Sequence, residues 1–198
     1  MPRKPDKQLE GRIIDAAYQL WSKGGEHAVT MRAVALAAKT TTPTLYERFQ
    51  DKHDLIVFMR LRARERMFAA LQPAKSSVEV CRLGLEFAIA NGNEYLLLTS
   101  DWAERFARKE RLPSYEFVQQ KLAEGLGGVP TDHARLALAL VAVVHGTAIL
   151  LLGDGICVEI SEEFKAACME ACEALIECGR KRVGAGRLRE LSKSGTKN

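Results

Sequence analysis

The sequence predicts an all-α protein in which a small N-terminal three-helix domain precedes a larger helical domain. Apolar residues recur at helical spacing along most of the chain, and no stretch alternates apolar and polar residues as a half-buried strand would. Hydrophobic residues make up 47% of the 198 residues and proline occurs only 6 times, so the chain can form long helices around a packed core.

The first predicted helix covers residues 9–24. Ile13, Ala17 and Leu20 fall on one face of this segment, which predicts an amphipathic helix with that face on a core. Gly24 and Gly25 follow as a stop signal at its C-terminus.

Two short helices and a long one are predicted next. Thr30 is the predicted N-cap of a helix that ends near residue 38, and Thr41 is the predicted N-cap of a second helix that ends near residue 49. Asp51 is the predicted cap of a long helix over residues 52–71, with Asp54 as its capping-box partner. Gln72-Pro73 ends that helix.

The rest of the chain is predicted to be helical as well. Ser76 opens the first of these helices, and residues 91–93 and 127–130 interrupt the pattern with glycine, asparagine and proline. Thr131 and Ser161 are the predicted N-terminal residues of the last two helices. The predicted spans are about 77–90, 94–110, 115–126, 131–152 and 161–183.

Residues 136–153, LALALVAVVHGTAILLLG, are apolar over about the length that raises the question of a membrane span. His145 lies within this segment, and the charged residues at its two ends show no positive-inside bias. We therefore expect a helix that is buried on nearly all sides, inside a core and a subunit interface.

These elements predict three parts: a helix-turn-helix domain over residues 1–50, a larger helical domain over 51–183 and a flexible tail over 184–198. The N-terminal residues are basic but no apolar segment follows them, so we expect no signal peptide and a cytoplasmic location. A net charge of +4 is too small to identify a ligand, and the positions of the basic residues must decide.

Residues 40–55, TTTPTLYERFQDKHDL, carry the candidate binding residues. Two short helices joined by a tight turn, with a basic and an aromatic residue on the second, match helix-turn-helix geometry, in which the second helix enters the major groove of DNA. Leu45 and Phe49 lie four residues apart and are predicted to turn inward. The outward-facing candidates for contact with base edges are Thr42, Pro43, Thr44, Glu47 and Arg48.

Other residues of this region are suited to the DNA backbone. The helix N-terminus at Thr41 can meet a phosphate, and Tyr46 and Lys52 can reach phosphate oxygens. Thr30 can do the same at the start of the preceding helix. A bare pair of short helices at this spacing is also compatible with simple packing, so the detail of the motif has to decide.

From Thr30 to Leu55, TMRAVALAAKTTTPTLYERFQDKHDL resembles the DNA-binding domain of the TetR family of bacterial transcriptional regulators. The shared features are the threonine-started helix, Ala-Ala before the turn, a threonine cap, Leu-Tyr, a following Phe, and Lys followed by Leu. The resemblance implies that these residues lie near DNA: Thr30, Thr41, Thr42, Thr44, Tyr46 and Lys52.

The turn departs from the family pattern. The family usually has Gly and then a Val-like residue where this chain has Lys39 and Thr40. If the turn needs a positive φ at residue 39, lysine there costs about 1 kcal/mol of strain. Lys39 also adds a positive charge near the DNA backbone.

The resemblance further implies a homodimer that reads a palindromic operator and releases it when a small molecule enters the C-terminal domain, and it favours a repressor. The last two predicted helices, 131–152 and 161–183, are our candidate dimer interface, because the first is too apolar to be covered by one neighbour. Their pairing across a two-fold axis would form a four-helix bundle.

Aromatic side chains in the middle helices, with a histidine on a neighbouring helix, are candidate effector ligands. An apolar pocket with few polar atoms suits a small hydrophobic or aromatic molecule. The same side chains can equally be core. The candidates are Phe87, Tyr95, Trp102, Phe106, Tyr115, Phe117 and His145.

The five cysteines include no CxxC pair, which argues against a disulfide framework and a zinc ribbon. We expect reduced, mostly buried thiols and predict no metal site, with a thiol- or metal-responsive sensor as an alternative. The cysteines are Cys81, Cys157, Cys168, Cys172 and Cys178.

The sequence contains no Gly-rich phosphate loop, GxSxG or HExxH motif, so we predict neither an enzyme nor a bound cofactor. The basic stretch 52–66 leaves one more alternative, a helical protein that binds a membrane surface or a partner protein.

Overall fold

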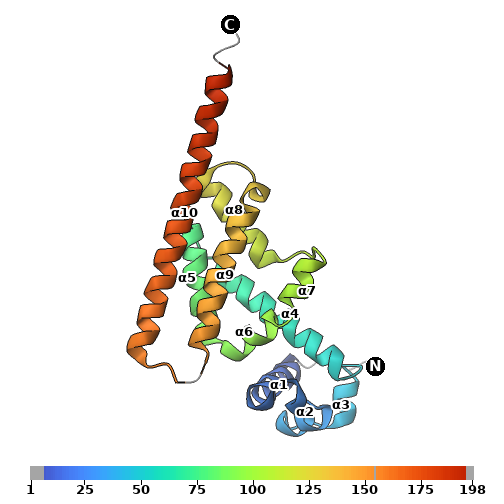
Figure 1. The fold of residues 1–198 in the computed structure, drawn as a ribbon. Helices are drawn as coiled ribbons and strands as arrows, with labels where there is room; N and C mark the ends of the chain where they lie inside the picture. The colour runs from blue at the N-terminus through green and yellow to red at the C-terminus, as the bar shows by residue number, and fades with distance from the viewer. Residues whose placement is uncertain (1–6, 154, 195–198) are drawn as a thin grey trace. The chain divides into compact units, whose positions relative to one another are not determined.

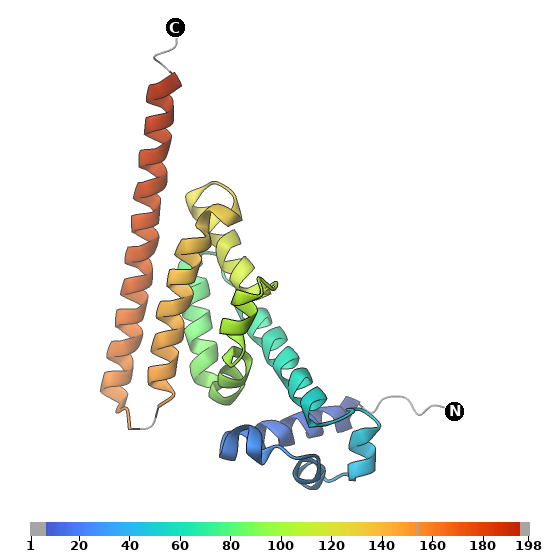
Figure 2. The same ribbon diagram turned by 45° about the vertical axis from the view of Figure 1, so that its right-hand side comes forward.

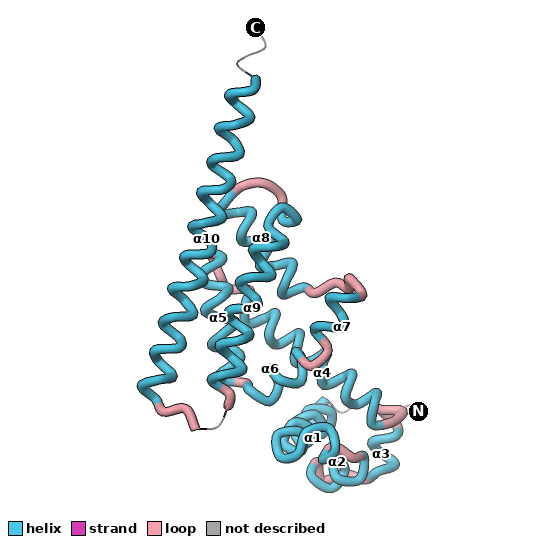
Figure 3. Tube along the Cα trace, viewed as in Figure 1, coloured by secondary structure: helices cyan, strands magenta, loops and turns pink. Residues whose placement is uncertain are grey.

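The computed structural model describes residues 7–153 and 155–194, and every regular element in that part of the chain is a helix (Figure 3). The all-α prediction is confirmed. The chain divides into two compact units, a head unit of residues 1–66 and 93–102 and a body unit of residues 67–92 and 103–198. The domain boundaries predicted at residues 50 and 183 stay predictions.

The head unit contains helices α1 (Lys7–Ala28), α2 (Met31–Ala37) and α3 (Thr42–Tyr46), the first part of α4 (Lys52–Leu71) and most of α6 (Gly92–Thr99) (Figure 1). A single core holds these elements together, because apolar residues of each helix are almost fully buried in it. Its largest members with no more than 4% exposure are Ile13, Val29, Val34, Leu45, Phe49, Leu55, Ile56, Met59 and Leu97.

Helix α1 ends its regular course at Gly24 and Gly25, as predicted. Gly25 has a φ of 58°, a left-handed value that a glycine adopts without strain, and one further turn leads to Ala28. The helix is tied to α4 by the phenol of Tyr18, which donates a hydrogen bond of 2.7 Å to the carbonyl oxygen of Met59.

The body unit is built from helices α5 (Ser77–Ala90), α8 (Pro113–Leu126), α9 (Ala134–Leu151) and α10 (Val158–Ser194), with a 3-10 turn at Pro130–His133 (Figure 2). Helix α5 packs against both α9 and α10, which also pack against each other. Ser76 caps α5 as predicted, since its hydroxyl accepts the backbone N–H of Glu79 at 3.2 Å.

The prediction of one helix over residues 94–110 is wrong, because a break at Ser100 and Asp101 separates α6 from α7 (Trp102–Ala107). The hydroxyl of Thr99 donates to the carbonyl oxygen of Tyr95 at 2.8 Å, and that of Ser100 donates to Leu97 at 2.7 Å. Such bonds compete with the backbone pattern of a helix and favour its end.

The predicted starts of the last two helices are also wrong. Thr131 lies inside the 3-10 turn, and α9 begins only at Ala134. Ser161 lies within the first turn of α10, where its N–H bonds to the carbonyl oxygen of Cys157 at 3.0 Å.

Helix α10 also continues beyond residue 183, to Ser194, although glycines occur at 184 and 186. A single glycine costs a helix only about 1 kcal/mol, and the segment has no proline to stop it. Residues 195–198 of the predicted tail and residues 1–6 of the predicted first domain lie outside the described residues.

The apolar helix is less covered by its own chain than we expected. Of the described residues, Pro130–Leu151 form one stretch that is long and apolar enough to cross a membrane, by length and composition alone. Only 17% of its most apolar window is buried. Its own chain therefore buries only a small part of this helix.

Candidate DNA-binding site

Helix α2 begins at a side-chain cap. Thr30 has an extended backbone, and its hydroxyl accepts the backbone N–H of Ala33 at 3.1 Å. The hydroxyl satisfies one of the free N–H groups at the helix start, and the remaining ones point outward with the positive end of the helix dipole. Thr30 therefore caps the helix as predicted, and its contact with a phosphate stays a prediction.

The turn between α2 and α3 does need a positive φ at residue 39. Lys39 has a φ of 53°, its N–H bonds to Leu36 at 3.2 Å, and the N–H of Thr40 bonds back to Ala35 at 2.9 Å. These two bonds form a Schellman motif, the common C-terminal cap that normally carries glycine at the left-handed position. The positive φ on which the predicted strain depends is confirmed, and the strain itself stays a prediction.

Helix α3 begins at Thr41 as predicted. Its hydroxyl accepts the backbone N–H of Thr44 at 3.3 Å and lies 2.8 Å from the hydroxyl of Thr44. Pro43 stands in the first turn, where the missing N–H costs nothing. The helix ends at Tyr46, earlier than predicted, and a turn carries the chain on to Phe49.

The recognition segment 41–49 has an inner and an outer face. Leu45 and Phe49 are buried as predicted, and the Phe49 ring meets Phe58 of α4 edge to face at 5.5 Å. Tyr46, by contrast, is 54% exposed. Thr41, Pro43 and Glu47 are also exposed, and Thr42, Thr44 and Arg48 are half-buried.

The start of helix α4 is capped on both sides. The carboxylate of Asp51 accepts the N–H of Asp54 at 2.9 Å, and the carboxylate of Asp54 accepts the N–H of Gln50 at 3.0 Å. This arrangement satisfies backbone N–H groups at the start of the helix. The Lys52 ammonium lies 3.8 Å from the carboxylate of Glu26.

One exposed basic residue of this region was missed by the sequence analysis. Arg32 is the second residue of α2, beside the Thr30 cap, and makes no ion pair within the described part of the chain. Helical periodicity contained the signal, because Arg32 lies between the buried positions Met31 and Val34 and must face away from them.

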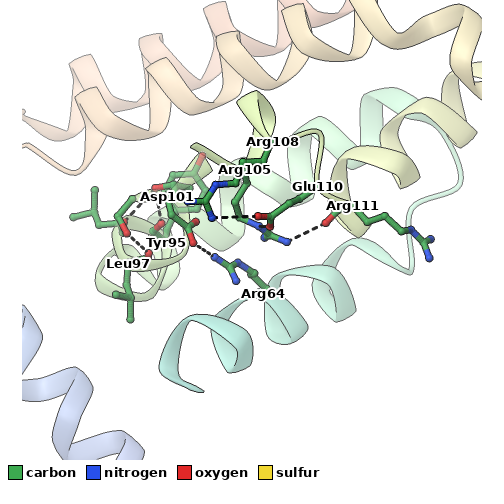
Figure 4. A network of polar contacts seen from close by, with 11 residues as sticks. Arg64, Tyr95, Leu97, Asp101, Arg105, Arg108, Glu110 and Arg111 are labelled. Atoms are coloured by element: carbon green, nitrogen blue, oxygen red, sulfur yellow. Dashed lines mark hydrogen bonds and ion pairs between the residues drawn. The ribbon is translucent and has the colours of Figure 1, made fainter. Parts of the chain in front are cut away.

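The segment 93–102 is the part of the head unit that the sequence analysis did not foresee. Leu97 is fully buried in the head core, and Glu94 pairs with Arg66. Asp101 pairs with Arg64 (Figure 4). Burial raises the pKa of the Glu94 carboxyl, and Arg66 opposes this. Helix α6 is thus fastened to α4 by an apolar residue and two ion pairs.

The predicted effector residues fall into both units. In the head, Tyr95 and Trp102 meet edge to face at 6.1 Å. In the body, Phe106 and Tyr115 do the same at 5.4 Å, while the Tyr115 phenol donates to the carbonyl oxygen of Ala134 at 2.8 Å. These pairs are brought together, but their role as ligands stays a prediction.

The remaining predicted effector residues are separate from these pairs. Phe117 meets Phe68 at 5.9 Å, Phe87 is buried, and burial lowers the pKa of the half-buried His145. The body also has a groove of about 340 Å³ between α5 and α10, whose lining contains none of the predicted residues. Its lining is Arg82, Leu85, Glu86, Ile89, Ala90, Lys165 and Met169.

Three of the cysteines are buried in the body unit, on helices α5 and α10. The thiol of Cys172 lies in hydrogen-bonding contact with those of Cys81 and Cys168. The Cys81 contact and burial raise the pKa of Cys172, and the Cys168 contact opposes this. Burial also raises the pKa of Cys168. Buried thiols with a raised pKa react slowly. No group of His, Cys, Asp or Glu that could hold a metal ion occurs among the described residues.

Comparison with known proteins shows which regulators this region is similar to. Residues 13–57 match the family model of bacterial regulatory proteins of the tetR family. The transcriptional repressor KstR of Rhodococcus jostii is 46% identical over 61 residues, 31% of this chain and 29% of that protein. KstR of Mycolicibacterium smegmatis is 47% identical over 63 residues, 32% of this chain and 31% of that protein. The match spans less than a third of the length of either relative.

Solved structures have a similar fold over most of this chain. A TetR-like transcriptional regulator from Rhodococcus sp. RHA1 superposes with a TM-score of 0.65 at 23% identity, over 89% of this chain and 98% of that one. A TetR-family regulator from Streptomyces coelicolor gives a TM-score of 0.61 at 17% identity, over 87% of this chain and 96% of that one. At such identities the likeness concerns the fold.

Proposed function

We propose that this chain, whose residues 13–57 match the tetR family of bacterial regulatory proteins, is a ligand-responsive, DNA-binding transcriptional repressor. Regulators of this family bind DNA operators and small-molecule effectors, generally as dimers, and are generally not enzymes. In this proposal the protein acts in the cytoplasm on a palindromic operator and uses no cofactor.

One observation carries the proposal. The segment that matches the family, residues 13–57, is also the segment in which a capped helix, a Schellman turn and a second capped helix present an outer face beside a buried inner one. A recognition helix held in this way can enter the major groove while its inner face stays on the head core. The family match over the same residues favours DNA binding over simple packing.

The proposed contacts fall into two kinds. Thr42, Pro43, Thr44 and Arg48 face the base edges and read sequence. The backbone contacts come from the rim of the site, and they position the head without reading sequence. Our candidates for these contacts are Thr30, Lys39, Thr41, Tyr46 and Lys52, with Arg32 as an addition from the structure.

The proposed homodimer is formed by helices α9 and α10. Large apolar side chains on both helices are exposed in the single chain, and soluble proteins rarely leave such a surface uncovered. A two-fold pairing of the two helices would bury it in a four-helix bundle and present two recognition helices to a palindrome. The exposed residues are Leu138, Ile149, Leu150, Val158 and Ile160.

The proposed effector is a small hydrophobic or aromatic molecule that binds the body unit. The segment 93–102 is part of the head, yet the chain continues from both of its ends into the body. A ligand that shifts these ends would move α6 on α4 and change the position of the recognition helix. Binding must then be reciprocal, so DNA lowers ligand affinity by the same factor. Equal ligand affinity for free and DNA-bound protein contradicts this mechanism.

The experiment that tests the function is selection of duplexes from a random library with the purified protein, repeated at two salt concentrations. The expected result is one palindromic site whose recovery persists at the higher salt. Retention that is sensitive to salt and blind to sequence would mean that the head binds the backbone without reading bases. Retention of no duplex at either salt would overturn the proposal.

The two alternatives lack a supporting observation of their own. A thiol or metal sensor needs reactive thiols in a group, whereas Cys168 and Cys172 are buried with raised pKa values. Cys157 and Cys178 are exposed, but no group that could hold a metal ion includes them among the described residues. For a protein that binds membranes through the basic start of α4, we would expect retention on anionic vesicles with no preference for duplex DNA.

A further inference from the structure

Lys52 differs from the other cations of the candidate DNA-binding site. Its ammonium lies 3.8 Å from the carboxylate of Glu26. Within the described residues, Arg32, Lys39 and Arg48 form no ion pair with a carboxylate. The head therefore presents several uncompensated cations and one whose charge is already balanced by a residue of its own chain.

The break in helix α1 is what brings Glu26 to this place. Gly24 and Gly25 interrupt the regular helix, and Glu26 begins the short final turn. The carbonyl oxygen of Glu26 accepts the N–H of Val29 at 3.2 Å. Lys52 is the first residue of α4, whose start is capped by the side chains of Asp51 and Asp54. The end of α1 and the start of α4 thus meet through this pair.

The pair is weak enough to exchange. The Lys52 side chain is 36% exposed and that of Glu26 is 56% exposed, so water and salt screen their attraction. A phosphate of DNA is a competing anion for the same ammonium. When a phosphate takes Lys52, the Glu26 carboxylate is left within a few ångströms of another negative charge, which opposes binding.

From this geometry we propose that Glu26 is a built-in competitor for the phosphate contact of Lys52 and limits the sequence-independent part of DNA affinity. The inference rests on the proposed function and adds to it a residue outside the recognition helices. Because phosphate contacts carry no sequence information, Glu26 tunes how tightly the head holds any duplex, and not which bases it prefers.

The test compares wild type with Glu26→Gln, Lys52→Gln and the double variant. Dissociation constants are measured over a series of salt concentrations, on the selected duplex and on a scrambled duplex of the same length. Glu10→Gln is the matched control, because it removes the same charge from the other end of α1. Glu10 pairs with Arg62 of α4 at 3.6 Å. Circular dichroism checks that each variant is folded.

We expect Glu26→Gln to tighten binding of both duplexes by about threefold to tenfold at low salt and to steepen the salt slope by up to about 0.9 per half-site, the value of one phosphate contact. Lys52→Gln should weaken binding and flatten the slope. In the Lys52→Gln background, Glu26→Gln should have no further effect. A purely structural role of Glu26 would leave the salt slope unchanged.

Three results would overturn the inference. If Glu26→Gln binds less tightly than wild type, the carboxylate positions Lys52. If it binds equally tightly, the carboxylate plays no part. Equal tightening by Glu10→Gln means that only net charge matters. Tightening that survives in the Lys52→Gln background excludes Lys52 as the target. A wild type that binds no duplex overturns the proposed function as well, whereas a wild type that binds while Glu26→Gln changes nothing overturns this inference alone.

Discussion

The hydroxyl of Thr41 lies 2.8 Å from the hydroxyl of Thr44 and also accepts the backbone N–H of Thr44 at 3.3 Å. One side chain therefore begins the recognition helix and fixes the orientation of a residue that we expect to face the bases. The cap and the reading surface are coupled through this contact.

Thr41→Ala is expected to weaken the head in two ways. It removes the N-cap of α3, which costs about 1 kcal/mol of unfolding free energy, and it frees the Thr44 hydroxyl. Thr41→Ser keeps the cap oxygen and is the control. Urea unfolding and operator binding of both variants check this, and a Thr41→Ala protein as stable as the serine variant would contradict the role of the cap.

Lys39→Gly is expected to stabilise the protein by about 1 kcal/mol, because glycine adopts the left-handed φ of 53° without the cost of a Cβ atom. Lys39→Ala loses the same charge but keeps the Cβ atom, so it should show no such gain. Thermal unfolding separates the two variants. If Lys39 also contacts the DNA backbone, both variants should lose salt dependence of binding to the same extent.

The parts of this molecule that could be predicted from the sequence are encoded locally. The caps at Thr30, Thr41 and Asp51 each depend on a side chain and a backbone group three residues away, and all three occur in the structure. The inner positions Leu45 and Phe49 follow from helical spacing alone. The helix-turn-helix was predictable for this reason.

The parts that could not be predicted depend on contacts between distant segments. The burial of Leu97 in the head core joins residues that are far apart in sequence, and no periodicity reports such a contact. The break at Ser100 depends on hydroxyl groups that bond to their own helix, a choice that the apolar pattern does not encode. The predicted effector residues share this difficulty, because they divide between the two units and periodicity does not report which of them lie together.

The two kinds of DNA contact predict different mutant behaviour. Tyr46→Ala is expected to weaken binding to all sequences alike, since we propose that Tyr46 contacts the DNA backbone. Thr44→Ala and Arg48→Ala are expected to change the preferred bases of the operator, by about 1–3 kcal/mol for a base read by two hydrogen bonds. Repeating the duplex selection with each variant checks this. An unchanged selected site for both Thr44→Ala and Arg48→Ala would contradict their assignment.

The proposed dimer predicts that a charge on the apolar face of α9 separates the subunits. Leu138 is 44% exposed in the single chain, so Leu138→Glu should leave the fold intact while burying a carboxylate in the interface. Light scattering should then report a monomer, and binding to the palindrome should be lost. Leu61→Glu changes a leucine of α4 that is 48% exposed and should remain dimeric. A dimeric Leu138→Glu protein would place the interface elsewhere.

Glu94 predicts a pH dependence of stability. Burial raises its pKa above the ordinary value of 4.5, with Arg66 and a hydrogen bond from Arg66 opposing, so the folded state holds the proton more tightly than the unfolded state does. A carboxyl with a raised folded pKa adds no penalty below pH 4.5, and its penalty grows as the pH rises through the folded pKa. Glu94→Gln removes the ionisation.

The quantity to measure is therefore the difference in unfolding free energy between wild type and Glu94→Gln, by urea titration from pH 4.5 towards neutrality. It should shift in favour of the glutamine variant as the pH rises. Glu65→Gln, which changes an exposed carboxylate of α4, should preserve the profile of the wild type. A difference that shifts in favour of the wild type would mean that the attraction of Arg66 outweighs burial, and that the fastening of α6 to α4 is strongest when both groups are charged.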